Sequence, residues 1–167
     1  MKRYQSFIVK IVAIALVISG GWCIWRATRE VPDLGAEASE PVNQAEGIAM
    51  TIKTPQHSAR KGMVIQWEVQ TESAQVYTFG GEEHSFAYLE RFVDGKWYRL
   101  EKITEPSAVP QPEIRVGGGE ATGVYANFVQ KYDGYGNHLE EGQYRLVLEM
   151  KDPDGNTGYL AAEFSVN

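Results

Sequence analysis

The residues with the strongest potential for metal chemistry are Glu82, Glu83 and His84, two carboxylates directly followed by a histidine. A zinc site takes three or four ligands, and usually more than one of them is His or Cys. The other histidines, His57 and His138, lie in separate segments, so a site would need convergence in space. We predict no metal and no cofactor, and keep a metal-dependent enzyme centred on His84 as a third hypothesis behind two binding functions.

A second acidic segment, Asp152-Pro153-Asp154-Gly155-Asn156, resembles the start of a calcium loop. Such a loop ends on a bidentate Glu at its twelfth position, which here is Glu163. The residues between alternate as a strand, and the glycine comes two places too early. The pattern therefore predicts a hairpin turn.

Nucleophilic and phosphate chemistry find little support in the sequence. There is no Gly-x-Ser-x-Gly elbow, and the single cysteine, Cys23, lies inside an apolar segment. The glycines at 117–119 lack a following Lys-Ser or Lys-Thr pair and precede a strand pattern. We predict no catalytic residue and a protein that is not an enzyme.

The remaining candidate is a loop rich in tyrosine and glycine, with Tyr132, Tyr135 and Asn137 as predicted contact residues. Exposed tyrosines among small residues are typical of adaptable recognition loops. The alternative is that both tyrosines only cover the edge of the fold. Either a protein or a cell-envelope component would be the partner.

Charge excludes one class of partner. Residues 30–167 hold eleven basic and all 22 acidic residues, a net charge of −11, whereas five basic residues lie in or beside the apolar segment. Nucleic-acid binding needs clustered Lys and Arg, so we exclude it.

The elements that position these residues begin with the apolar segment from Phe7 to Trp25. As a helix its 19 residues rise about 28 Å, close to the thickness of a bilayer core. Cleavage after Ser19-Gly20-Gly21 is an alternative, and lipidation of Cys23 is disfavoured by the large residue before it. We predict an uncleaved signal anchor over residues 1–29, a single-pass protein of the cell membrane.

Flanking charge sets the predicted orientation. Lys2, Arg3 and Lys10 lie on the N-terminal side, whereas Arg26 and Arg29 are soon offset by acidic residues. The positive-inside rule therefore places the N-terminus in the cytoplasm and the rest outside. Residues 30–46 are acidic, contain Ala and Pro without apolar periodicity, and predict a flexible linker.

From residue 47 onward the sequence predicts an all-β domain. Short runs with a period of two are separated by turn signals such as Asp94-Gly95 and Asp154-Gly155. The predicted strands cover 48–54, 63–69, 86–93, 97–100, 121–129, 144–150 and 159–166. About seven strands over this length indicate an Ig-like antiparallel β-sandwich in residues 47–167.

Three aromatic residues are predicted to be structural. The segment Leu139-Glu140-Glu141-Gly142-Gln143-Tyr144 matches a tyrosine corner, in which the hydroxyl bonds back to upstream backbone. Leu146 stands where antibody-like domains carry a cysteine, and Trp67 is expected to fill core volume facing it. Trp97 follows the predicted hairpin turn at Asp94-Gly95.

Residues from about 46 to 167 resemble the bacterial Ig-like domain of short exported and surface proteins of Gram-positive bacteria. The motifs that carry the likeness are Val93-Asp94-Gly95-Lys96-Trp97-Tyr98, Gly119-Glu120, Leu139-Glu140-Glu141-Gly142-Gln143-Tyr144-Arg145, Asp154-Gly155-Asn156 and Glu163-Phe164-Ser165-Val166. The resemblance implies fold and location rather than an activity. We therefore expect a non-enzymatic, membrane-anchored interaction or envelope-scaffolding module. The alternative function is inhibition of an extracellular hydrolase, with the loop from Pro106 to Pro112 inserted into the enzyme.

Overall fold

Every regular element in the part of the chain that the structure describes is a β-strand. The computed structural model describes residues 30–57, 62–80, 87–104, 113–119, 122–130 and 133–167. The strands are β1 Leu34–Glu37, β2 Ile48–Ile52, β3 Gln56–His57, β4 Val64–Thr71, β5 Val76–Phe79, β6 Ala87–Val93, β7 Lys96–Leu100, β8 Ile114–Gly117, β9 Thr122–Val129, β10 Gly142–Lys151 and β11 Thr157–Val166. The prediction of an all-β domain is confirmed.

The seven predicted strands correspond to β2, β4, β6, β7, β9, β10 and β11. Their regular alternation of apolar and polar residues made them visible in the sequence. The strands β1, β3, β5 and β8, each of two to four residues, were not predicted. A strand that short carries too few residues to establish a period of two.

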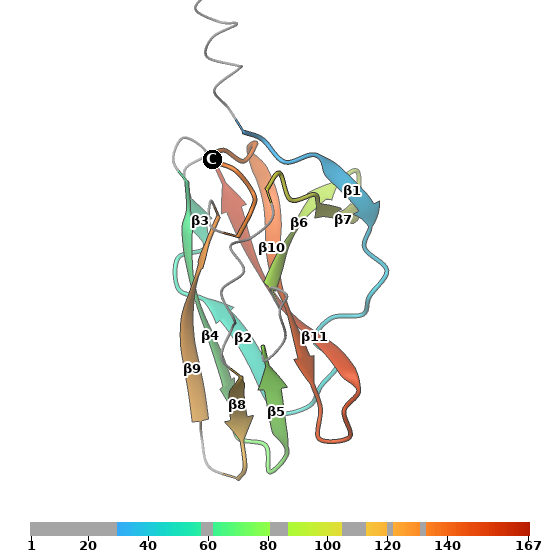
Figure 1. Ribbon diagram of the computed structural model, residues 1–167, viewed down its shortest axis with the longest axis vertical. Coiled ribbons are helices and arrows are strands. Elements are labelled where there is room, and N and C mark those ends of the chain that lie inside the picture. Colours follow the sequence, from blue (N-terminus) through green and yellow to red (C-terminus); the bar gives the residue numbers. More distant parts are fainter. Residues whose placement is uncertain (1–29, 58–61, 81–86, 105–112, 120–121, 131–132) are drawn as a thin grey trace, which may run out of the picture. The chain divides into compact units, whose positions relative to one another are not determined.

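The strands form two sheets (Figure 1). The smaller sheet has the order β2-β4-β9, and both of its pairs are antiparallel. The larger sheet has eight strands in the order β1-β7-β6-β10-β11-β3, with β5 also paired to β10 and β8 paired to β5. It is mixed, because the short β3 runs parallel to the end of β11.

One hydrophobic core draws residues from both sheets. From the smaller sheet come Ile65, Trp67 and Phe128, all at most 3% exposed. From the larger sheet come Leu146 and Leu160, which are fully buried. Trp67 is thus a core residue in the same cluster as Leu146, as the sequence predicted, and the core is held without a disulfide because the chain has one cysteine.

The prediction that residues 30–46 form a flexible linker is wrong. Within this segment β1 pairs with β7, and the Asn43 amide nitrogen donates to the Tyr159 carbonyl at 2.8 Å. The Asn43 side chain also bonds both backbone groups of Ala161, at 2.9 and 3.1 Å. Composition was misleading because these interactions use backbone groups and one amide side chain, which leave no apolar periodicity.

The same segment covers the outer face of the larger sheet. Since β7 and β11 lie on opposite sides of β6 and β10, the chain between β1 and Asn43 must cross those two strands. Figure 1 shows this connection passing outside the sheet. Tyr88 and Val147, opposed on β6 and β10, alternate with the buried residues Leu89 and Leu146 and are nevertheless only 4% and 0% exposed.

The predicted anchor from Phe7 to Trp25 lies outside the described residues. Among the residues that are described, no helix is long and apolar enough to span a bilayer.

Candidate functional site

The predicted recognition loop places its central tyrosine in the core. Tyr135 is fully buried, and its hydroxyl accepts a hydrogen bond from the Leu89 amide nitrogen at 3.2 Å. Burial raises the pKa of the Tyr135 hydroxyl to about 12. The expectation of an exposed Tyr135 is therefore wrong, and Asn137 is exposed whereas Tyr132 lies outside the described residues.

Gly134 in this loop serves a backbone contact. Ile103 donates from its amide nitrogen to the Gly134 carbonyl at 2.7 Å. Gly134 has φ of +92°, and a Cβ there would stand 2.3 Å from the Thr104 carbonyl oxygen. Because only glycine fits this approach, the composition that suggested adaptability reflects a fixed crossing of two chain segments.

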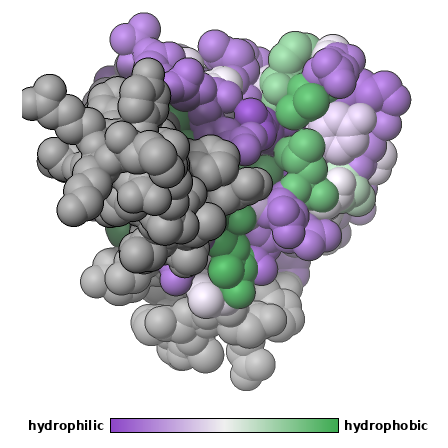
Figure 2. All heavy atoms as spheres, turned by 90° about the horizontal axis from the view of Figure 1, so that it is seen from above, coloured by the Kyte–Doolittle hydropathy of each residue, from purple (hydrophilic) through white to green (hydrophobic). Residues whose placement is uncertain are grey.

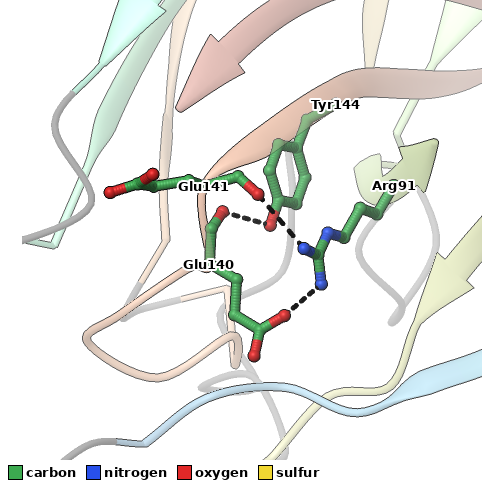
Figure 3. Close-up of polar contacts among 4 residues, drawn as sticks. All are labelled: Arg91, Glu140, Glu141 and Tyr144. Carbon is green, nitrogen blue, oxygen red and sulfur yellow. Dashed lines mark hydrogen bonds and ion pairs between the residues drawn. The ribbon is translucent and has the colours of Figure 1, made fainter. Parts of the chain in front are cut away.

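The tyrosine corner is confirmed (Figure 3). Tyr144, 1% exposed, donates its hydroxyl to the Glu140 carbonyl at 2.6 Å. Arg91 of β6 pairs with the Glu140 carboxylate and donates to the Glu141 carbonyl at 3.1 Å. The corner thus ties the start of β10 to the neighbouring strand, and Tyr144 has a structural role.

Trp97 lies in a stack of charged and aromatic side chains on the larger sheet. The Arg145 guanidinium lies 4.6 Å from the Trp97 ring centre, and the Phe92 ring lies 5.1 Å away on the other strand of the hairpin. Arg145 also pairs with Glu90 at 2.5 Å, and these two side chains are 11% and 3% exposed. Trp97 thus packs against a nearly buried ion pair, which gives it a structural role, although Phe92 on the rim of the stack is 42% exposed.

The acidic segment at Asp152 forms a hairpin turn, as the sequence predicted. One Asp152 carboxylate oxygen accepts the amide nitrogens of Asp154 and Asn156, at 2.9 and 2.8 Å, and the other accepts the Asn156 side chain. The carboxylate is thus engaged within its own turn. No group of three or more metal-ligating side chains occurs among the described residues, and the cluster Glu82, Glu83 and His84 lies outside them.

The end of the domain that carries β1 and β7 shows mostly hydrophilic side chains, with small groups of hydrophobic ones between them (Figure 2). Leu34, Phe92 and Ile103 are each exposed by a little over 40%. Apolar residues scattered in this way are ordinary on protein surfaces. The candidate site must therefore come from another face.

None of the described segments covers the outer face of the smaller sheet. Its central row places Thr51, Glu68 and Tyr125 opposite one another on β2, β4 and β9. Tyr125 is 66% exposed and Val64, on the same face of β4, is 49% exposed. This openness contrasts with the outer face of the larger sheet, where Tyr88 and Val147 are buried.

A cavity of about 610 Å³ opens on this face. It is lined by Gly47, Ile48, Ala49, Glu68, Gln70, Thr71, Glu72, Gly123 and Tyr125. The hollow exists because the row next to the centre places the small residues Ala49 and Gly123 on either side of Gln70. Its lining is acidic, aromatic and amide in character.

Glu68 organises the polar groups of this site. It lies on the outward face, yet it is 2% exposed because Lys53, Gln70 and Tyr125 close over it. Its bond from the Lys53 ammonium, with those from Tyr125 and Gln70, lowers the pKa of the Glu68 carboxyl to about 2. A carboxyl that stays ionised at neutral pH is a poor proton donor, so this arrangement suits binding better than acid catalysis.

This site was not predicted from the sequence. Glu68, Gln70 and Tyr125 are spread over two strands that are far apart in the chain, and only the register of β4 against β9 brings them together. The one local signal was the polar face of two alternating strands, which is also what a plain solvated face presents.

Comparison with known proteins gives only distant likenesses. No protein-family model matches the sequence, and no curated protein matches it either. The alkylpurine DNA glycosylase AlkC of Pseudomonas fluorescens, solved bound to DNA, is similar at 6% identity and a TM-score of 0.36 over 75% of this chain and 32% of AlkC.

A β-glucosidase of Erythrobacter marinus is similar at 9% identity and a TM-score of 0.38 over 72% of this chain and 15% of the enzyme. The bacterial hydrophobin BslA is similar at 14% identity and a TM-score of 0.37 over 80% of this chain and 97% of BslA. The chain thus spans less than a third of the first two proteins, and the TM-scores are too low to carry an argument about function.

Proposed function

We propose that this protein is a membrane-tethered, extracytoplasmic Ig-like β-sandwich that serves as a non-enzymatic interaction module of the cell envelope. The fold part of the proposal is supported by two sheets that share one core and by the tyrosine corner at the start of β10. The tether is supported by the apolar segment from Phe7 to Trp25 and by the flanking charges.

The observation that carries the binding function is the difference between the two outer sheet faces. The chain covers the larger sheet with its own residues between β1 and Asn43. As far as the structure describes the chain, the smaller sheet stays open, with a cavity and the exposed ring of Tyr125. A concave site with convergent polar groups beside an aromatic ring is the usual form of a ligand site.

The chemistry of the lining favours a partner that brings cationic or hydroxyl groups. Glu68 and Glu72 both line the cavity, and residues 30–167 carry a net charge of −11. This field attracts basic groups and repels phosphates. The Lys53 ammonium contacts Glu68 and lies 5.0 Å from the Tyr125 ring centre, which supports the proposal that these groups suit an alkylammonium.

A photo-crosslinking residue in the full-length chain, in its own cells, tests the binding face. Position 49 lies in the cavity, and position 64 is the matched control, exposed on the same sheet face but outside the cavity. We expect a discrete adduct from position 49 and none from position 64. Equal labelling from both positions, or none, would refute the binding face.

The tether is tested separately in the same cells. Protease added outside intact protoplasts should digest the β-domain, and alkaline carbonate should leave the full-length protein with the membrane. Protection from the protease would refute the orientation, and release by carbonate would refute the anchor.

A further inference from the structure

The smaller sheet ends in an unusually open edge strand. β9 has eight residues, TGVYANFV, with no charge and no proline, and among the described strands it pairs only with β4. The other edge strands are shorter, namely β1, β2, β3 and β8 with two to five residues each. Natural proteins usually protect an edge with charge, proline, bulges or short length, because its backbone groups can pair with another strand.

The hydrogen-bond pattern identifies which residues of β9 face outward along the edge. Gln130 donates its amide nitrogen to the Met63 carbonyl, on the side of β4. Backbone groups alternate sides along a strand, so the odd-numbered residues of β9 turn theirs away from β4. Val129 agrees with this, because its amide and carbonyl both bond to Asp133.

Three residues therefore present backbone groups to the open edge: Gly123, Tyr125 and Asn127. Among the described residues no hydrogen bond is seen from their amides or carbonyls to another strand. The Tyr125 ring does not block the edge, because its hydroxyl bonds Glu68 on β4 and the side chain leans in that direction.

We propose that a second copy of this chain pairs with this edge, β9 against β9, in an antiparallel two-fold dimer. The exposed set is symmetric about Tyr125, with Gly123 and Asn127 two residues to either side. An antiparallel pair centred on Tyr125 places Tyr125 opposite its own copy and Gly123 opposite Asn127. Each opposed pair then exchanges two backbone hydrogen bonds.

Both the register and the occupant follow from the edge itself. In a sheet continued through the dimer, side chains on one face pair only with side chains on the same face of the second copy. Only registers that place odd-numbered residues of β9 opposite odd-numbered residues are therefore allowed. A centre at residue 124 or 126 would bring two opposed pairs from Gly123, Tyr125 and Asn127 instead of three, and a centre at 126 would also require the backbone groups of Val129, which Asp133 already uses. The strand has no charge, so its copy meets no like charge across the pair.

Cysteine cross-linking of the full-length chain in mild detergent tests the register. In a Cys23→Ser background, Tyr125→Cys places two sulfurs on strands whose Cα atoms are about 5.5 Å apart, within disulfide range. Asn127→Cys is the matched control, since its copy lies about 13 Å away along the strand. We expect a disulfide dimer from position 125 and none from position 127; the reverse, or equal cross-linking, overturns the proposal.

A charge swap on the two-fold axis tests the interface without a covalent bond. Tyr125→Lys and Tyr125→Glu each place like charges opposite each other and should weaken dimerisation on the order of tenfold or more by sedimentation. An equimolar mixture of the two should restore the dimer. A wild-type chain that stays monomeric at all concentrations, or a mixture no better than its components, overturns the proposal. The test uses the purified chain alone, so it is independent of the envelope partner.

Discussion

The tyrosine corner allows a quantitative test of how the fold is held. The substitution Tyr144→Phe removes one hydroxyl and keeps the ring, which stacks on Phe164 at 5.6 Å. It deletes the 2.6 Å hydrogen bond to the Glu140 carbonyl, at a residue that is 1% exposed. No cavity is created beyond the hydroxyl itself, so the change isolates the polar contact.

The expected cost follows from that burial. A buried hydrogen bond contributes about 1 kcal/mol net, and a carbonyl left without a partner adds a desolvation term, so Tyr144→Phe should cost about 1–2 kcal/mol. For a domain of this size that corresponds to a fall in Tm of roughly 3–8 °C. Thermal and urea unfolding followed by near-ultraviolet circular dichroism measures both quantities.

Alkaline pH provides a second, independent readout. Burial raises the pKa of the Tyr144 hydroxyl from 10.0 to about 12. The folded protein therefore resists ionisation that the unfolded chain undergoes, and the contribution to stability present below pH 10 is lost as pH rises towards 12. Tyr144→Phe should flatten part of this decline.

The matched control is Tyr98→Phe, whose hydroxyl makes no hydrogen bond to any residue that the structure describes. It should change the free energy of unfolding by less than about 0.5 kcal/mol. If Tyr144→Phe is as stable as wild type, or if Tyr98→Phe loses as much, the corner does not hold the start of β10.

Three further perturbations test other interactions by chemical denaturation. Arg145→Met leaves the Glu90 carboxylate, which is 3% exposed, without its partner and should lower the free energy of unfolding by about 3 kcal/mol or more, whereas the double variant with Glu90→Leu should recover most of this loss. Equal losses of stability in the single and double variants would contradict a buried ion pair. Asn43→Gly keeps the positive φ of 58° but removes the side-chain bonds to Ala161, so it should lower the free energy of unfolding by about 1–2 kcal/mol. An unchanged stability would show that the segment between β1 and Asn43 is not held in place by Asn43. Burial lowers the pKa of His57, so the unfolded chain binds the proton more readily and stability should fall as pH drops below 6.5; His57→Gln should remove that slope, and an unchanged slope would assign it to other groups.

The sequence predicted those parts of the fold that depend on a repeated pattern. β4, β10 and β11 bury alternate residues over eight to ten positions, so a period of two was readable. The corner at Tyr144 was readable because its contact spans four residues, from the hydroxyl to the Glu140 carbonyl. A contact between residues this close in sequence can be predicted without knowledge of the rest of the chain.

The predictions that were wrong, and the site that was missed, concern residues whose partners lie far away in the sequence. Asn43 reads as a linker residue until Ala161, 118 positions later, is placed beside it. Tyr135 reads as an exposed recognition residue until Leu89, 46 positions earlier, is seen to donate to its hydroxyl. Glu68 and Tyr125 likewise form one site only through strand register, which no single-sequence pattern determines.

The segment between β1 and Asn43, which crosses the larger sheet, also helps to interpret the surfaces of the smaller sheet. The chain uses the segment between β1 and Asn43 to cross one sheet face and, through Asn43, to bind part of the edge of β11. Covering a face in this way orders a segment that would otherwise be free, which costs conformational entropy and must be offset by the hydrogen bonds and packing that the segment makes. The smaller sheet has no such cover among the described residues, although its face carries an exposed aromatic ring and its edge three residues with outward backbone groups. This difference between the two faces, seen among the described residues, is the common basis of the two contacts that we propose, one on the face of the smaller sheet and one along β9.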